Sequence, residues 1–351
     1  MVARHGGSEA GYPVETQACR DGPTPHVPDI EGTRMTSGQW TVEKAPRLDG
    51  LVAVVTGASG GLGYETALGL ASRGASVVLA ARNAGKAENA LRRIRAAVER
   101  ADVRFLPLDL ADLAAVRRFA DELRSRGGPV DILVNNAGVM AYPTRRLTRD
   151  GFEEQFGTNY LGHFALTAHL LPALLGSAGG ARVVSLASLA HVQGRIDIDD
   201  LQGERRYDGW TAYRQSKLAM LIFARELQRR AELNGWPLRS VAVHPGWAMT
   251  DIITNGPGQG RGGPGTAVMN VAFRLFGQSA TAGALPILYA ASAPDAEPGG
   301  YYGPTGRGER TGPVGSSRVM PQAKDADMAR ALWDASERLT GLRFQTAEEA
   351  A

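Results

Sequence analysis

Short apolar runs rich in β-branched residues alternate along this chain with longer amphipathic stretches, and this alternation limits its fold more than any other feature. Each apolar run is continuous, which is typical of strands buried on both faces of a parallel sheet. The pattern therefore predicts an α/β fold with a doubly wound parallel sheet, a Rossmann fold. The expected strands are 51–55, 76–81, 103–106, 130–134, 182–186 and 238–243, and the expected helices include 84–99, 113–125, 152–175 and 210–233.

The alternation starts at residue 48, and the sequence before it has no periodicity. Residues 1–47 are rich in Gly, Pro, Thr and charge, so we expect a disordered N-terminal tail. We interpret 48–345 as a single domain, because no repeat or second domain is visible. The segment 246–278 contains a Gly/Pro-rich stretch and apolar residues, which predicts a substrate lid.

The composition excludes several classes of protein. The 351 residues are 43% hydrophobic and 21% charged, with net charge +3 and no basic stripe, so we expect no nucleic-acid partner. The single cysteine, Cys19, excludes an internal disulfide and a Cys-rich zinc site, and we expect no metal. The apolar run 51–55 is far too short to span a bilayer, and no signal-peptide core precedes it. We therefore expect a cytoplasmic protein with no stable membrane insertion.

A glycine-rich turn joins the first expected strand to the helix after it. Such glycines let the backbone approach a pyrophosphate, and the helix N-terminus supplies N–H groups and a positive dipole end. A tight turn without a ligand is the structural alternative. The candidate cofactor-binding residues of the turn are Gly57, Ser59, Gly61, Leu62 and Gly63.

The end of the second expected strand indicates which dinucleotide would bind. An NAD site usually carries a carboxylate there for the ribose 2′-hydroxyl, but this sequence has Arg82 and no acidic residue. A guanidinium pairs well with a 2′-phosphate. The sequence therefore favours NADP over NAD; the structural alternative is that Arg82 is a solvated residue at a helix start, which is common.

Four polar residues are candidates for catalysis. Tyr213 and Lys217 lie four residues apart in an expected helix, so they share one face, and a nearby cation lowers the pKa of a phenol. Ser188 ends the fifth expected strand, and Asn159 lies inside an expected long helix, where an amide fits poorly unless it binds something such as a water. The structural alternatives are that Tyr213 and Lys217 form an ordinary surface pair, that Ser188 only forms a turn, and that Asn159 marks a tolerated helix kink.

Other candidate cofactor residues follow strands, on the side of a parallel sheet where ligands bind. They are Asp109, Leu110, Asn136, Ala137, Gly138, Pro245, Gly246 and Thr250.

Together these motifs resemble the short-chain dehydrogenase/reductase family over most of the chain. Its cofactor loop matches Thr56 to Gly63, its strand-four motif matches Asn135 to Gly138, and its catalytic tetrad matches Asn159, Ser188, Tyr213 and Lys217 in order. The 25-residue interval from Ser188 to Tyr213 and the tryptophan Trp40 are similar to the retinol dehydrogenase-like branch. Ala187 departs from that branch, where a second serine is common.

The resemblance implies a role for each matched residue. Tyr213 would exchange a proton with the substrate oxygen, Ser188 would orient that oxygen, and Lys217 would lower the pKa of Tyr213 and bind the nicotinamide ribose. Asn159 would hold a water that relays protons to Lys217. Asp109 and Leu110 would border the adenine, Asn136 and Gly138 the ribose side, and Gly246 and Thr250 the nicotinamide side. Pairing through the two long helices would make a homo-oligomer.

These observations predict an NADP-dependent oxidoreductase that moves a hydride between nicotinamide and the alcohol or carbonyl carbon of a small molecule. Apolar residues within 247–278 suit a lipophilic substrate, but they equally suit plain packing on the sheet, and shallow membrane contact is a third reading. A non-catalytic NADP-binding sensor or scaffold is the alternative function. An isomerase or dehydratase that uses nicotinamide transiently is another.

Overall fold

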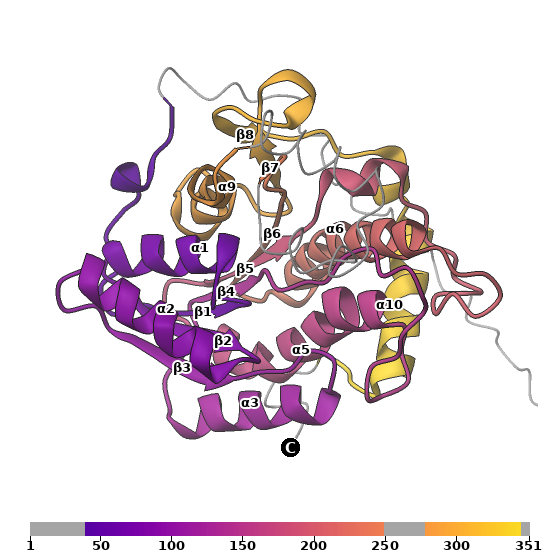
Figure 1. The fold of residues 1–351 in the computed structure, drawn as a ribbon, viewed down its shortest axis with the longest axis horizontal. Coiled ribbons are helices and arrows are strands. Elements are labelled where there is room, and N and C mark those ends of the chain that lie inside the picture. The colour runs from indigo at the N-terminus through magenta and orange to yellow at the C-terminus, as the bar shows by residue number, and fades with distance from the viewer. Residues whose placement is uncertain (1–38, 249–277, 345–351) are drawn as a thin grey trace, which may run out of the picture. The chain divides into compact units, whose positions relative to one another are not determined.

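The computed structural model describes residues 39–248 and 278–344, and a single twisted sheet organises them (Figure 1). The strand order is β3-β2-β1-β4-β5-β6-β7-β8. Neighbouring strands are parallel, except that β8 runs antiparallel to β7. The strand order reverses between β1 and β4, which is the switch point where doubly wound sheets bind ligands. The strands are β1 (Val52–Thr56), β2 (Ser76–Ala81), β3 (Val103–Pro107), β4 (Ile132–Asn135), β5 (Ala181–Leu186), β6 (Leu238–Val243), β7 (Tyr301–Pro304) and β8 (Val314–Ser316).

Helices cover both faces of the sheet, as the predicted doubly wound fold requires. One apolar core joins the sheet to α1 (Gly61–Ser72), α2 (Ala84–Ala97) and α9 (Ala280–Ser292). The other core joins it to α3 (Leu113–Ser125), α5 (Gly162–Leu175) and α6 (Gly209–Asn234), with α10 (Ala326–Thr340) packed against α6. The short helical turns are η1 (Val42–Lys44), η3 (Leu189–Gln193), η4 (Arg307–Glu309) and η5 (Pro321–Ala323).

The helix expected over 152–175 is not continuous. It begins as α4 (Glu154–Phe156), widens into the π-helix η2 (Gly157–Leu161), and continues as α5. Glycines at both ends of η2 permit close contacts, since a Cβ on Gly162 would lie 2.4 Å from the carbonyl oxygen of Leu110. A π-turn inside a helix often marks a functional position, and this one carries Asn159.

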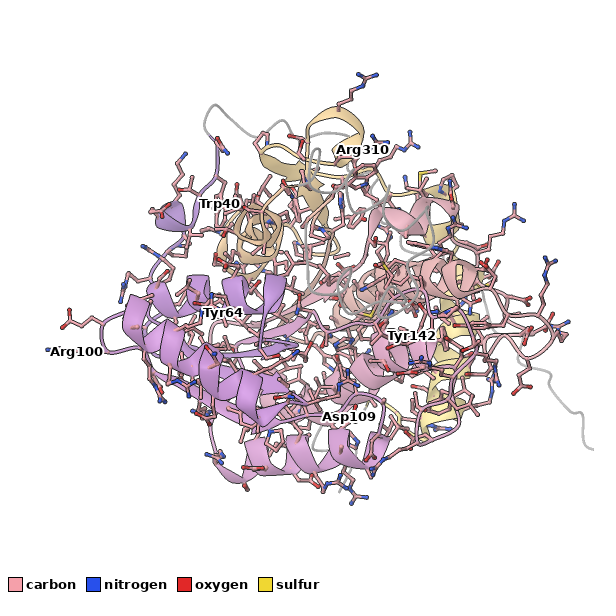
Figure 2. The ribbon with its side chains drawn as sticks, viewed as in Figure 1. Trp40, Tyr64, Arg100, Asp109, Tyr142 and Arg310 are labelled. Carbon is pink, nitrogen blue, oxygen red and sulfur yellow. The ribbon has the colours of Figure 1, made fainter. Side chains whose placement is uncertain are left out.

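The N-terminal boundary of the domain differs from the expected one. Residues 39–47 pack onto the domain: Trp40 is buried and meets the ring of Tyr289 edge-on at 5.5 Å, and Ala45 is buried in the same core (Figure 2). The predicted tail therefore extends too far at its C-terminal end, and its first 38 residues lie outside the described part of the chain. None of the described helices is both long enough and apolar enough to cross a membrane.

Candidate active site

A pocket of about 300 Å³ opens at the carboxyl ends of β1, β2 and β4, at the switch point of the sheet. Its size is at the lower end of the range for small-molecule sites. Most of the predicted cofactor residues line it, namely Gly57, Ser59, Gly61, Leu62, Gly63, Arg82, Leu110, Asn136, Ala137 and Gly138. Asp109 is not one of the lining residues, because its carboxylate turns back to accept the N–H of Ala111 at 3.0 Å.

The glycine turn is shaped by contacts that only glycine permits. A Cβ on Gly63 would lie 2.4 Å from the carbonyl oxygen of Gly57, and Gly57 itself has a φ of +68° against Ala137. These contacts hold the N-terminus of α1 close to the end of β1. The backbone of the turn is thereby exposed to the pocket, which suits a pyrophosphate.

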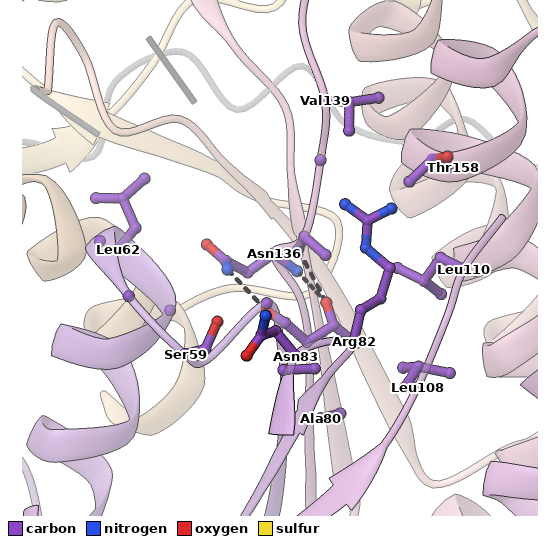
Figure 3. A pocket seen from close by; sticks show the side chains of 18 of the residues that line it. Ser59, Leu62, Ala80, Arg82, Asn83, Leu108, Leu110, Asn136, Val139 and Thr158 are labelled. Atoms are coloured by element: carbon purple, nitrogen blue, oxygen red, sulfur yellow. Dashed lines mark hydrogen bonds between the residues drawn. The ribbon is translucent and has the colours of Figure 1, made fainter. Parts of the chain in front are cut away.

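The Thr56 hydroxyl fastens the segment after β4 to the glycine turn. Thr56 Oγ1 accepts the N–H groups of Asn136 and Ala137, each at 2.9 Å, and the Asn136 amide donates to the Thr56 carbonyl at 2.7 Å (Figure 3). His163 Nδ1 donates to the carbonyl of Asn159 at 2.8 Å, which leaves Nε2 to accept the Thr56 proton at 2.9 Å. Burial lowers the pKa of His163 to about 3, so the ring stays neutral.

The end of the pocket beside β2 carries two cations. Arg82 extends from the end of β2 toward Leu110 and Thr158, as Figure 3 shows, and Lys86 lines the same pocket from the first turn of α2. Asn83 caps this helix by accepting the N–H of Lys86 at 2.9 Å. Sequence reasoning found Arg82 but missed Lys86, although its position one turn past the strand end was a usable signal.

Thr158 also lines the pocket and was not foreseen. Thr158 is 5% exposed, and its hydroxyl has no hydrogen-bond partner among the described residues. A buried hydroxyl without a partner is costly, so a polar ligand group in this pocket would relieve it. This unpartnered atom, the glycine cradle and the two cations together fit a dinucleotide.

The four predicted catalytic residues come together from three elements. Ser188 follows β5 as the N-cap of η3, and Tyr213 and Lys217 lie on α6. The Ser188 hydroxyl hydrogen-bonds the Tyr213 phenol. Lys217 Nζ donates to the carbonyl of Leu186, at the end of β5, at 3.0 Å. The hydroxyls of Ser188 and Tyr213 and the ammonium of Lys217 therefore lie beside the end of β5.

The electrostatics of this group differ from the expectation in one respect. Burial is the main influence on the pKa of Tyr213 and raises it, while the hydrogen bond from Ser188 lowers it. Lys217 is not among the causes, contrary to the predicted effect of its charge on the phenol. Lys217 is itself 2% exposed, and burial lowers its own pKa from 10.5 to about 8.

The side-chain amide of Asn159 joins two segments of the fold. Its Oδ1 accepts the Val139 N–H at 2.7 Å, and its Nδ2 donates to the Val139 carbonyl and to Ser216 Oγ, both at 2.9 Å. These bonds tie the segment after β4 to α6. The amide lies beside Lys217, since a Cβ on Gly138 would be 3.1 Å from Asn159 Oδ1 and 3.5 Å from Lys217 Nζ.

The segment after β6 is only partly described. Pro245 and Gly246 follow the strand as predicted, whereas Thr250 and most of the predicted lid 246–278 lie outside the described residues. Gln278, where the description resumes, donates to the carbonyl of Pro245 at 2.6 Å and to that of Trp247 at 2.8 Å. The two ends of the lid segment are therefore held together.

Comparison with known proteins agrees with this site. The family model for short chain dehydrogenase matches residues 51–257. Mouse polyprenol dehydrogenase is 39% identical over 88% of this chain and 89% of its own, and mouse retinol dehydrogenase 12 is 40% identical over 85% and 89%. A crystal structure of an uncharacterized protein from Mycobacterium Paratuberculosis is 42% identical, with a TM-score of 0.72 over 88% of this chain and all of that one. The resemblance inferred from the motifs is thus confirmed, and the chain belongs to the short-chain dehydrogenase/reductase family of oxidoreductases.

Proposed function

We propose that this chain is an NADP-dependent oxidoreductase that interconverts an alcohol and a carbonyl group on a lipophilic small molecule. The observation that carries the cofactor choice is the pair Arg82 and Lys86, which line the pocket at the end of β2, where no carboxylate is present. Two cations attract a 2′-phosphate, and a guanidinium binds it through several donors. A carboxylate, which NAD sites use for the 2′-hydroxyl, would repel it.

The catalytic group supports proton exchange with a substrate oxygen. Because burial raises the pKa of Tyr213, its phenol keeps its proton at neutral pH and can donate it to a developing alkoxide. Ser188 bonds the same phenol and offers a second hydroxyl to that oxygen. The buried ammonium of Lys217 adds positive charge at the end of β5, which stabilises negative charge there. A bound nicotinamide supplies or accepts the hydride.

Apolar side chains beside the catalytic pair support a lipophilic substrate. Trp210 is 38% exposed and meets the ring of Tyr213 edge-on at 6.0 Å. Val192, four residues after Ser188, is 39% exposed. Large apolar groups exposed around a reactive oxygen provide a surface for an apolar chain or ring. Two of the similar proteins are named for retinol and polyprenol, which are both lipophilic alcohols.

The first test is of the cofactor. NADPH and NADH binding should be measured for wild type, Arg82→Ala and Lys86→Ala, with Arg92→Ala, an exposed change elsewhere on α2, as the matched control. We expect each pocket variant to bind NADPH about tenfold less tightly, as for the loss of a charge-assisted hydrogen bond, with NADH unchanged. An equal loss for both dinucleotides would refute the 2′-phosphate argument.

The second test is of turnover. Reduced nicotinamide should be consumed with a panel of aldehydes and ketones of increasing apolar size, and Tyr213→Phe should consume it about a thousandfold more slowly with all of them. Tight NADPH binding without turnover of any compound would favour a sensor or scaffold. Preference for small polar carbonyls would refute the lipophilic part of the proposal alone.

A further inference from the structure

A buried histidine joins the segment after β6 to the turn between β7 and β8. His244 is fully buried, and its Nδ1 accepts the N–H of Gly246 at 3.2 Å. Nδ1 therefore carries no proton, and the ring proton lies on Nε2. Nε2 is 3.2 Å from Glu309 Oε2 and 2.9 Å from Ser317 Oγ. The imidazole thus donates to the turn and accepts from the segment.

The turn is built to present Glu309 to this histidine. Glu309 has a φ of +55°, a left-handed conformation that a residue other than glycine holds only when its surroundings fix it. Its second oxygen, Oε1, accepts the N–H of Arg318 at 3.0 Å. On β7, a Cβ at Gly303 would lie 2.1 Å from His244 Nε2, so glycine is needed there to admit the ring.

The same turn contacts the segment on the other side of Gly246. The Trp247 N–H donates to the Arg310 carbonyl at 2.7 Å, and the Arg310 guanidinium lies over the Trp247 ring at 4.2 Å (Figure 2 labels Arg310). Gly246 has a φ of +62°, and a Cβ on it would lie 2.3 Å from the Arg310 carbonyl oxygen. The turn therefore holds the segment at two consecutive points and leaves Gly246 closely packed between them.

This segment lies at the catalytic end of the cleft. β6 pairs with β5, the strand that leads to Ser188, and Leu186 is in register with Val243. The ring of Tyr301 stands between His191, three residues after Ser188, and His244, with centroids at 5.4 and 5.2 Å. Arg82 directly follows β2, which lies on the opposite side of β1 and β4 from β5 and β6. A dinucleotide with its phosphorylated ribose at Arg82 must therefore extend toward β5 and β6 with its reactive end.

We propose that Glu309 and His244 are positioning residues that fix the segment Pro245–Gly246 and, through it, the nicotinamide end of the cofactor. The inference rests on the proposed function, because it takes the reactive end of the bound molecule to be nicotinamide. It also gives a purpose to the β7–β8 turn, which lies outside the stretch that the family model matches.

The test separates the two ends of the cofactor. Binding of NADPH and of adenosine 2′,5′-bisphosphate, which lacks the nicotinamide half, should be measured for wild type, Glu309→Ala and His244→Phe. Arg307→Ala, an exposed change on the same turn, is the matched control. We expect the two variants to bind NADPH about three- to tenfold less tightly, as for the loss of one or two hydrogen bonds, and to bind the half-cofactor within about twofold of wild type.

The fluorescence of bound NADPH gives a second readout, because it reports the surroundings of the reduced nicotinamide ring. In both variants we expect it to move toward that of free NADPH, with no change for Arg307→Ala. Equal weakening for NADPH and for the half-cofactor would show a general structural role and overturn the inference. Unchanged NADPH binding and fluorescence would overturn it as well.

Two further arms keep the result decisive. If Glu309→Ala does not fold, Glu309→Gln replaces it, because an amide oxygen can still accept the imidazole proton. Glu309→Gln should bind NADPH about twofold less tightly and should bind the half-cofactor as wild type does. An equal loss of affinity for NADPH and for the half-cofactor would again overturn the inference. If wild type binds NADH in place of NADPH, the proposed cofactor is wrong. The Glu309 and His244 variants are then tested with NADH and with ADP, which lacks the nicotinamide half, by the same criteria.

Discussion

Lys217 is a buried cation, and its burial predicts how the stability of the protein depends on pH. Burial lowers its pKa from 10.5 to about 8, which corresponds to about 3 kcal/mol at about 1.4 kcal/mol per tenfold change. Below pH 8 the folded protein bears the full cost of this charge. Between pH 8 and 10.5 the unfolded chain holds a proton that the folded chain has released, so this residue makes stability rise with pH.

The substitution Lys217→Met removes the charge but keeps the apolar stem. At pH 7 it removes about 3 kcal/mol of burial cost and loses one hydrogen bond to Leu186, worth about 1 kcal/mol, so we expect a variant about 2 kcal/mol more stable than wild type. By pH 10.5 that advantage should disappear or reverse, because the folded lysine is then neutral and the unfolded lysine has lost about half of its protons, so little burial cost remains. The same variant should be inactive.

Urea unfolding of wild type and variant at pH 7, 8.5 and 10 measures this difference directly. Other groups titrate equally in both proteins, so their contributions cancel in the comparison. Lys86→Met is the matched control at an exposed lysine, and its difference from wild type should stay flat. A Lys217→Met difference that does not change by at least about 1 kcal/mol across this range would refute the argument from burial.

Three further substitutions test the site and the fold. Tyr213→Phe should lower kcat by about a thousandfold with little change in NADPH binding, and steady-state kinetics with any accepted carbonyl would measure both. Gly63→Ala should abolish NADPH binding, since its Cβ would lie 2.4 Å from the Gly57 carbonyl oxygen; a variant titrating like wild type in NADPH fluorescence would contradict this. Trp333→Ala should cost about 3–5 kcal/mol in urea unfolding, because its ring is 1% exposed; a loss below about 1 kcal/mol would show that the cavity closes.

The central sheet was predictable because the residues of each strand indicate, without any distant contact, that the strand is buried on both faces. Each of the six expected strands is present, with bounds that shift by two residues or fewer, since continuous β-branched runs have no other stable place than a doubly covered sheet. β7 (Tyr301–Pro304) and β8 (Val314–Ser316) were not predicted, because four and three residues containing Gly and Pro carry no periodicity. β7 forms by pairing with β6, and β8 forms by pairing with β7, so both depend on tertiary contacts.

The helices that were missed show a related limit. α9 is apolar on nearly all sides and contains Pro286, so it has no polar face to reveal a helical period. It packs against α1 and against the sheet, and this packing overrides the proline. The π-turn at Asn159 was missed for another reason, because its bonds to Val139 and Ser216 join segments that the sequence does not place together.

The site was predictable where a residue's role follows from its position at a strand end. Arg82, Ser188 and the glycine turn are of this kind, and the structure places them where expected. His163 and Glu309 are not, because each gains its importance from a contact across the fold, and Thr158 is not, because only the fold places its unpartnered hydroxyl at the pocket. The direction of the pKa shift of Tyr213 could not be predicted from the sequence either, because it depends on how completely α6 is covered.

The covering of α6 has a consequence for self-association. Trp333 of α10 stacks on Phe223 of α6 at 5.9 Å and meets Phe164 of α5 at 5.1 Å, and Phe344 closes the cluster at 4.6 Å from the indole. α10 thus occupies, within the same chain, a face of the two long helices where the family resemblance placed a second subunit. A tethered helix competes at a far higher effective concentration than a separate molecule. Pairing of two copies through this face of α5 and α6 would therefore require α10 to be displaced.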